Sequence, residues 1–359
     1  MPALFGREWS RAELERRTGR LDQVAGIDPH ELIDGRGRGA RALHVRAGGG
    51  LAFWSIADRA LDIAGAEYRG APLCWRSRNG VAAPAFAEHA GDGFLRTFFG
   101  GLLTTCGLGN FGPAGSDAWG TFGLHGRINT TPAEDVRTAV RWDGEECALE
   151  VHGTMRETAV FGEDLRLERT LRTFVGSRRI DVHDRVTNAG SERRPHMLLY
   201  HCNGGFPILN EHATLHVSES GVRPRDAEAA RGLTEWNRGG APQPEFAEQV
   251  FVHEPVACRD GRATAVLAPG DDAAGLPALA VRFDPTQLPA MFSWRMLGAG
   301  TYVMGIEPAN CPTIEGRVAA ASAGTLPFLE PGETRRYDLS FEVLPAPDDV
   351  AAALAGFPR

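Results

Sequence analysis

Apolar and polar residues alternate with a period of two along much of the chain. Such alternation is typical of strands that bury one face and expose the other. The 44 glycines and 23 prolines of the chain separate short alternating runs, as expected for many strands joined by turns. The clearest of these runs are 42–45, 51–56, 147–152, 165–174, 179–187, 213–217, 263–267, 278–283 and 337–343. The pattern predicts an all-β sandwich.

Helical periodicity is confined to the two ends of the chain. Ser10 followed by Glu13 matches a capping box, which predicts a short N-terminal helix over residues 10–17. A second helix is expected over 348–355, with Asp348 as its N-cap.

The polar segment 223–248 is rich in Pro, Gly, Ala and Arg. This composition predicts a long loop or excursion over the surface, which could serve as a lid. No fixed repeat and no linker divides the 359 residues, and β-sandwiches often exceed about 200 residues as one unit. We therefore expect a single domain over 1–359, with residues 1–40 as an N-terminal extension packed on it.

The composition points to a small-molecule partner. A net charge of -8 without a basic run argues against nucleic acid or an anionic membrane as partner. No apolar run approaches the roughly 18 residues of a membrane span. Charges stand where a secretory signal would be apolar, so a cytoplasmic location is expected. The six cysteines form no CxxC pair, and we expect them to be reduced.

The chain contains no lysine, so all 38 basic residues are arginine. Schiff-base enzymes, pyridoxal-phosphate enzymes and P-loop nucleotide binders are excluded, because each needs a lysine amine. Residues 107–112 (GLGNFG) match a dinucleotide motif, but Pro113 and Gly115 follow where that motif needs a helix. These glycines are instead expected to let a loop turn sharply or approach a ligand. General acid–base, metal or cysteine chemistry remains.

Three segments concentrate the candidate chemistry. Each places an ionisable residue at the end of an apolar run and before a turn, where a side chain can face a ligand cleft. The alternative for each is a hydrogen-bonded core or rim residue. The segments are FGLHGRIN with His125, HMLLYHCNGGFP with His201, and YVMGIEPANCP with Glu307.

The order of these segments resembles the aldose 1-epimerase (galactose mutarotase-like) superfamily, and more closely its DUF4432 branch. The resemblance implies a β-supersandwich of two large, mainly antiparallel sheets. It covers most of the chain from about residue 40. The matching pieces are 58–63, 99–108, 123–129, 184–190, 196–207, 294–317 and 329–337.

The resemblance also implies roles for individual residues. His201 corresponds to the general acid, Glu307 to the general base and His125 to a ligand of a sugar hydroxyl. The HCNG segment departs from the family's aromatic form, and the family's substrate-binding aspartate has no equivalent here, so the sugar can differ from galactose and glucose. Further substrate-binding candidates in or near the matching segments are Arg59, Asp62, Arg96, Asn203 and Trp294.

The chemistry of anomer exchange suits these residue types. Ring opening removes a proton from the anomeric hydroxyl and protonates the ring oxygen, which needs one base and one acid and no cofactor. Glu307 is then expected to be ionised, and His201 protonated, at neutral pH. A bell-shaped rate profile would follow, with Glu307 on the acid limb and His201 on the alkaline limb.

Two other functions stay open. One is a metal- or acid/base-assisted isomerase or lyase of keto sugars on the same scaffold, for which His196 could join His125, His201 and Glu307 in a Zn, Fe or Mn site. A carbohydrate-binding module without turnover is the other alternative. We expect a sugar as the small-molecule partner, and a homodimer as the assembly.

Overall fold

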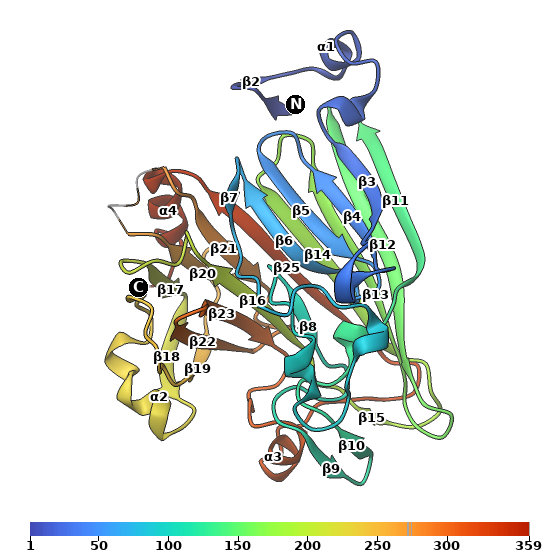
Figure 1. Ribbon diagram of the computed structural model, residues 1–359, viewed down its shortest axis with the longest axis vertical. Coiled ribbons are helices and arrows are strands. Elements are labelled where there is room, and N and C mark those ends of the chain that lie inside the picture. The colour runs from blue at the N-terminus through green and yellow to red at the C-terminus, as the bar shows by residue number, and fades with distance from the viewer. Residues whose placement is uncertain (271–272, 274, 359) are drawn as a thin grey trace.

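The fold consists mainly of antiparallel β-sheet (Figure 1). It is taken from a computed structural model that describes residues 1–270, 273 and 275–358. The predicted all-β class and mainly antiparallel pairing are confirmed, and all nine predicted alternating runs lie in strands, apart from Ala213 at one end. The described residues form three large sheets, because a five-stranded sheet accompanies the two larger ones.

The sheets have the following strand orders. The eight-stranded sheet is β11 (Glu134–Asp143), β12 (Glu146–Thr158), β13 (Asp164–Phe174), β14 (Arg179–Asn188), β25 (Thr334–Leu344), β21 (Ala278–Phe283), β20 (Ala263–Ala268) and β17 (Thr214–Val217). The six-stranded sheet is β18 (Glu219–Pro224), β19 (Gln249–Pro255), β22 (Ala290–Gly298), β23 (Thr301–Ala309), β16 (Leu199–Gly205) and β8 (Thr104–Cys106). The five-stranded sheet is β3 (Gly26–Glu31), β4 (Arg41–Arg46), β5 (Leu51–Ile56), β6 (Asp62–Tyr68) and β7 (Ala71–Pro72).

The remaining strands form short two-stranded pairs. These are β1 (Ala3–Leu4) with β2 (Arg7–Glu8), β9 (Gly115–Asp117) with β10 (Gly120–Phe122), and β15 (Arg194–Pro195) with β24 (Phe328–Leu329). The described α-helices are short and lie at the periphery, as α1 (Arg11–Glu15), α2 (Ala227–Arg231), α3 (Arg317–Ser322) and α4 (Pro347–Leu354).

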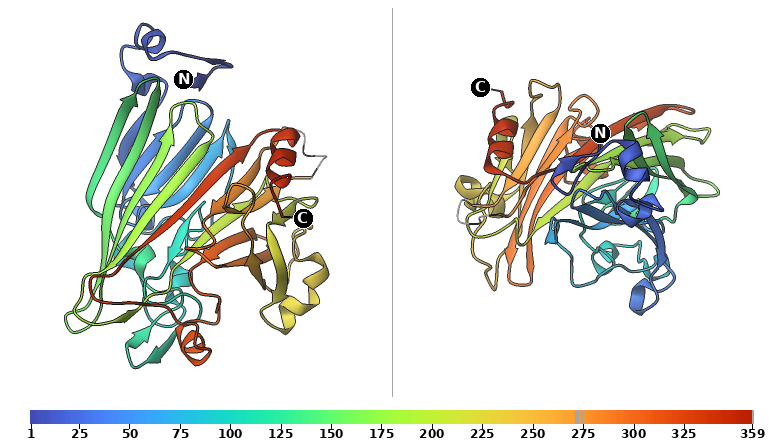
Figure 2. Two further views of the ribbon diagram at one scale, coloured as in Figure 1. Left: turned by 180° about the vertical axis from the view of Figure 1, so that it is seen from behind. Right: turned by 90° about the horizontal axis from the view of Figure 1, so that it is seen from above.

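One hydrophobic core joins the three sheets. The outer side of the eight-stranded sheet faces the viewer in Figure 2 (left), with red β25 between β14 and β21. Its inner face carries Val151 and Leu171, which belong to the same buried cluster as Phe53 of β5 and Ile306 of β23. The alternation in β12 and β13 therefore reflects a sheet with one face on the core and one in solvent.

The terminal helices differ in detail from the prediction. The Ser10–Glu13 capping box is present, but α1 ends at Glu15. The predicted N-cap of the C-terminal helix is wrong, because α4 starts at Pro347 after Ala346. Proline is well suited to the first helical position, where its missing N–H has no intrahelical partner to lose.

The segment 223–248 is an excursion between two strands of the six-stranded sheet. It leaves the end of β18, forms α2 and a turn of 3-10 helix over Leu233–Glu235, and returns to β19 at Gln249. The predicted N-terminal extension also contributes to a sheet, since β3 pairs with β4 along its whole length.

A fully buried ion cluster lies between the sheets. Arg169 of β13 is 2.7 Å from Asp62 and 2.6 Å from Asp184, and all three side chains have no exposed area. The hydroxyl of Tyr200 donates to Asp184, and that of Thr105 donates to Asp62. The cluster therefore links β6, β8, β13, β14 and β16 directly behind the strand that carries His201.

Candidate active site

The site is built on the face of the six-stranded sheet that points away from the core. β16 and β23 are antiparallel neighbours in which Cys202 pairs with Ile306, so His201 lies opposite Glu307 one step along the register. Residues opposite each other in an antiparallel pair have Cβ atoms about 4.5–5.5 Å apart. Residues 106 positions apart in sequence (307 minus 201) thus become direct neighbours.

The side chains of His201 and Glu307 face each other at close range. Nε2 of His201 is 3.3 Å from Oε1 of Glu307, and both side chains are nearly inaccessible, at 6% and 4% exposure. Oε1 of Glu307 and Nδ1 of His201 are buried without a hydrogen-bond partner among the described residues. Buried polar atoms are normally paired, so Oε1 of Glu307 marks a place where a polar ligand would be favourable.

His125 reaches the same place from a turn. Its backbone adopts a φ of 57°, and its Nδ1 accepts a hydrogen bond from the backbone N–H of Gly112 at 3.3 Å. The neutral ring therefore carries its proton on Nε2, which is free to donate. The ring centroid of His125 is 5.9 Å from that of His201. The structure thus brings together the three residues that the sequence singled out.

Aromatic rings form the walls around His201. The rings of Phe98 and Trp294 lie 5.0 Å and 5.4 Å from the imidazole, both edge to face. Trp75 contacts both of these rings, at 5.9 Å and 6.1 Å. Trp294 was a substrate-binding candidate from the sequence, whereas Phe98 was not singled out there.

Burial sets the protonation of the three candidate residues. It raises the pKa of Glu307 to about 8, with the Glu248 carboxylate adding to the effect. It lowers the pKa of His201 to about 3 and that of His125 to about 4. At neutral pH the ligand-free pair is therefore a protonated Glu307 beside a neutral His201. The charges expected on both groups are thus disfavoured in the ligand-free site, because burial removes hydration from each of them.

The excursion 223–248 supplies two charged residues at the edge of the site. Nε1 of Trp294 donates to Oε2 of Glu248 at 3.0 Å, and Arg225 lies 3.2 Å from Oε1 of the same carboxylate. The charge of Arg225 lowers the pKa of Glu307, and that of Glu248 raises it. Neither residue was singled out from the sequence, although their segment was recognised as a candidate lid.

Asn203 follows His201 two positions later on the same strand and is not exposed to solvent. Its side chain is fully buried, and Nδ2 donates to the backbone oxygens of Gly101 and His201. Its Oδ1 has no hydrogen-bond partner among the described residues, and the Asn203 side chain raises the pKa of the His201 imidazole. We therefore expect Asn203 to orient His201.

The other residues expected to bind substrate lie elsewhere. The expected contact of Arg59 and Asp62 with substrate is not supported, since both are fully buried. Arg59 donates to three backbone carbonyl oxygens, and Asp62 belongs to the buried ion cluster. Arg96 is 71% exposed and pairs with Glu88 at 3.3 Å, in the same 3-10 turn as Phe94.

His196 does not join the other two histidines. Its Nδ1 lies 3.1 Å from the backbone oxygen of Leu108 and its Nε2 2.9 Å from the hydroxyl of Tyr337. Both ring nitrogens are thus engaged in structural bonds. In the described part of the chain, no cluster of three or more His, Cys, Asp or Glu side chains is arranged to hold a metal ion.

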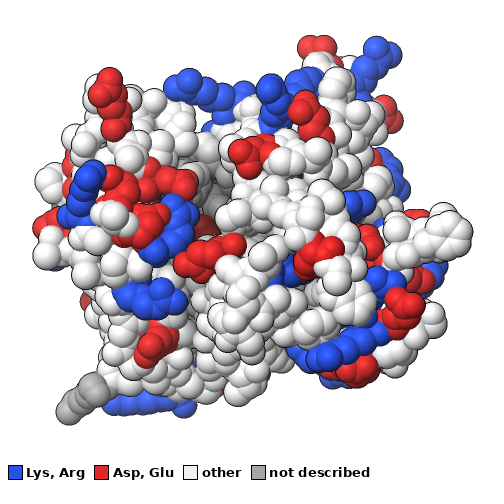
Figure 3. All heavy atoms as spheres, turned by 90° about the horizontal axis from the view of Figure 1, so that it is seen from below, with Lys and Arg blue, Asp and Glu red and all other residues white. Residues whose placement is uncertain are grey.

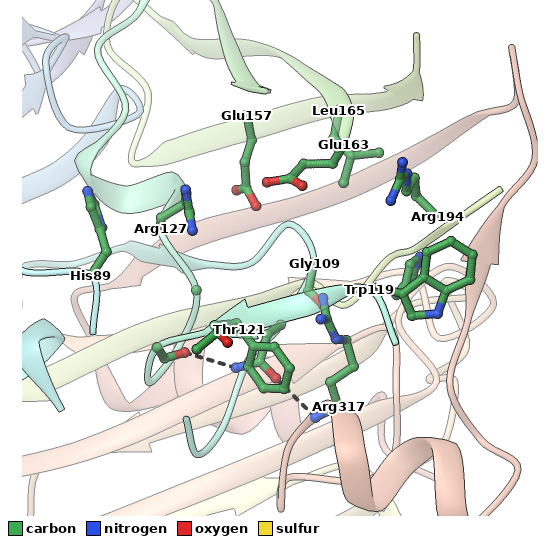
Figure 4. A pocket seen from close by; sticks show the side chains of 15 residues that line it. His89, Gly109, Trp119, Thr121, Arg127, Glu157, Glu163, Leu165, Arg194 and Arg317 are labelled. Carbon is green, nitrogen blue, oxygen red and sulfur yellow. Dashed lines mark hydrogen bonds between the residues drawn. The ribbon is translucent and has the colours of Figure 1, made fainter. Parts of the chain in front are cut away.

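A small polar cavity is lined by Gly109, Gly123 and Gly126 together with several charged side chains (Figure 4). Glu157 accepts a hydrogen bond from the backbone N–H of Leu108 there, and burial raises its pKa to about 7. The volume of about 50 Å³ holds a few water molecules but not a sugar. The charged and imidazole side chains that line it are His89, Arg127, Glu157, Glu163, Arg194 and Arg317.

Acidic and basic side chains are interspersed around a central hollow at the end of the molecule seen from below (Figure 3). The face in that view carries no continuous basic patch among the described residues, and such a patch is what phosphate backbones require. None of the described helices is both long and apolar enough to span a membrane.

Comparisons with known proteins agree with this fold. The sequence model of one family, a domain of unknown function (DUF4432), matches residues 37–343. No curated protein matches the chain at a significant level. A solved structure from Klebsiella pneumoniae, described as a candidate aldose 1-epimerase, is 27% identical over 91% of this chain and 85% of its own, with a TM-score of 0.85.

Two more distant structures share the fold alone. A galactose mutarotase-like protein from Clostridium acetobutylicum is 13% identical, covering 90% of this chain and all of its own, with a TM-score of 0.65. Galactose 1-epimerase from Lactobacillus acidophilus is 12% identical, covering 89% and 98%, with a TM-score of 0.55. The galactose mutarotase-like fold expected from the sequence is thereby confirmed.

Proposed function

The chain belongs to the DUF4432 family, and on that premise we propose that it is a carbohydrate isomerase that interconverts the anomers of a sugar by acid–base catalysis. The observation that carries this proposal is the isolated His201–Glu307 pair, 3.3 Å apart, with an unpartnered acceptor and aromatic walls. The similarity to a candidate aldose 1-epimerase agrees with it.

The pair holds one titratable proton, and that proton is sufficient for the reaction. A sugar hydroxyl that donates to Oε1 of Glu307 stabilises the carboxylate, and a ring oxygen that accepts from His201 stabilises the imidazolium. Binding of sugar therefore favours transfer of the proton from Glu307 to His201. Glu307 then accepts the proton of the anomeric hydroxyl while His201 protonates the ring oxygen, and the bond between that oxygen and the anomeric carbon breaks.

Reclosure completes the exchange. After rotation of the open-chain aldehyde, the ring hydroxyl adds to the other face of the carbonyl, returns its proton to His201, and the new anomeric oxygen takes one from Glu307. When the sugar leaves, the proton on His201 returns to Glu307, so the protein ends in its starting state and neither oxidant nor cofactor enters the balance. His125, with Nε2–H available, is placed to donate to a sugar hydroxyl. We infer a cytoplasmic setting and no nucleic-acid or membrane partner.

The test is an NMR screen of anomer exchange across aldoses, uronates and keto sugars, repeated with Glu307→Gln and His201→Asn. General acid–base groups contribute about 10²- to 10⁴-fold each, so either variant should lose that much in kcat while sugar affinity changes little. If Glu307→Gln exchanged anomers at the rate of the wild type, Glu307 would not be the base. Saturable sugar binding without exchange by the wild type would favour a binding module instead.

A further inference from the structure

The side chain of Glu307 occupies space that a side chain at position 305 would fill. On the site face of the sheet, Gly305 of β23 is flanked by Asn203 of β16 and Trp294 of β22. A Cβ atom at Gly305 would lie 2.6 Å from Oε1 of Glu307 and 2.9 Å from Cβ of Trp294. Distances below 3.0 Å are not found for real Cβ atoms, so the carboxyl group rests in the gap left by the glycine.

The backbone at this position does not itself require glycine. Gly305 is not among the residues with positive φ, and it pairs in regular antiparallel register on both sides. Glycine weakens a strand interior because it has no side chain to pack and costs more entropy to order. Glycine at position 305 thus destabilises the strand, and the backbone conformation does not require it. Its presence therefore indicates that another group approaches the backbone closely.

We propose that Gly305 is a positioning residue, whose missing side chain lets the Glu307 carboxyl lie back along the strand with Oε1 facing His201. This rests on the proposed acid–base function of the pair. Placed so, Oε1 lies 3.3 Å from Nε2 of His201 and has no other partner, which leaves it available to a hydroxyl of the ligand. An alanine methyl would displace the carboxyl from this gap.

Several ionisable groups surround the carboxyl, and the test must separate Gly305 from them. His201 faces it from β16, and Glu248 and Arg225 act on it from the excursion. Burial raises the pKa of the Cys106 and Cys202 thiols well above the ordinary value, and the charge of Glu307 adds to this effect. None of these groups changes in Gly305→Ala, so a change in Glu307 can be traced to the added methyl.

Gly305→Ala should lower kcat by about 10- to 100-fold with little change in KM, because misplacing a catalytic group by about 1 Å has this effect. The apparent pKa of Glu307 should fall from about 8 toward its ordinary 4.5, since the carboxyl leaves an enclosed gap. The matched control is Gly298→Ala at the end of β22, where only the flexible end of Met296 lies within 3.0 Å. It should leave both quantities unchanged.

A double-mutant cycle separates positioning from a structural role. If Gly305 acts through the carboxyl, Gly305→Ala should cost less than about twofold in the residual rate of Glu307→Ala, because the partner is absent. Should Gly305→Ala alone melt too low for assay, Gly305→Ala/Glu307→Ala must regain the Tm of Glu307→Ala. Failure to regain it would show that Trp294 or the backbone fills the gap, which overturns the proposal.

The placement can be tested even if no sugar is turned over. In protein with ¹³C-labelled glutamate, the Glu307 carboxyl resonance is identified by its loss in Glu307→Gln, and its titration is followed in wild type and Gly305→Ala. An unchanged titration in folded Gly305→Ala overturns the role of Gly305. A changed titration without anomer exchange by the wild type retains that role and rejects only the proposed reaction.

Discussion

Trp294 donates a hydrogen bond from its indole Nε1 to Oε2 of Glu248 at 3.0 Å, which ties the aromatic wall of the site to the end of the excursion 223–248. Glu248 also pairs with Arg225 at 3.2 Å. Two opposite charges from one surface segment thus lie where they act on the protonation of Glu307 in opposite directions.

The pH dependence of anomer exchange should follow the protonation of His201 and Glu307. The active form carries one proton on the His201–Glu307 pair, so the rate should form a bell between about pH 3, where His201 becomes protonated in addition, and about pH 8, where Glu307 loses its proton. His201 thus controls the acid limb and Glu307 the alkaline limb, which is the reverse of the order expected from the sequence.

Removing either charge should move the alkaline limb in a defined direction. Glu248→Gln removes a charge that raises the pKa of Glu307, so the limb should move to lower pH, and Arg225→Gln should move it to higher pH. Both groups are partly exposed, so we expect shifts of less than about one pH unit that shrink with added salt. Glu254→Gln on the exposed part of β19 is the control, and shifts of equal sign in the first two variants would contradict the assignment.

Loss of the His125 side chain should weaken binding more than turnover. Its Nε2–H is available to donate, and a hydrogen bond of this kind contributes about 0.5–1.5 kcal/mol, so His125→Ala should raise the Kd of the best sugar by about 2- to 12-fold. Titration calorimetry measures this directly. His89→Ala, in the separate polar cavity, should bind sugar as the wild type does. A kcat loss as large as that of Glu307→Gln would instead make His125 part of the proton transfer.

The buried ion cluster should dominate stability rather than sugar recognition. Arg169→Met leaves Asp62 and Asp184 buried without their cation, and breaking a buried pair in this way costs about 3–5 kcal/mol. Urea unfolding at pH 7 should show this loss. Arg156→Met, which removes a 2.8 Å pair with Asp164 from a half-exposed position, should cost less than about 1 kcal/mol. Similar losses in both variants would show that the cluster is not held by its charges.

The sequence by itself determined the fold class and the main candidates for chemistry. Strands such as β12 and β13 bury one face only, so their period of two is visible without a structure. His125, His201 and Glu307 could be named because each ends an apolar run before a turn and matches a segment of the family. Single residues such as Arg59 and Asp62 could not be assigned in this way, because a motif does not show which partner a side chain meets.

Only the tertiary structure decided how the site works. β16 is buried on both faces, so it shows no alternation, and the register that sets His201 opposite Glu307 is not written in either strand alone. The protonation of the pair follows from burial by Phe98 and Trp294, and from charges on a segment that folds back from far along the chain. Sequence fixes which groups can ionise, whereas distance and loss of water fix which of them do, because both depend on neighbours that only folding brings together.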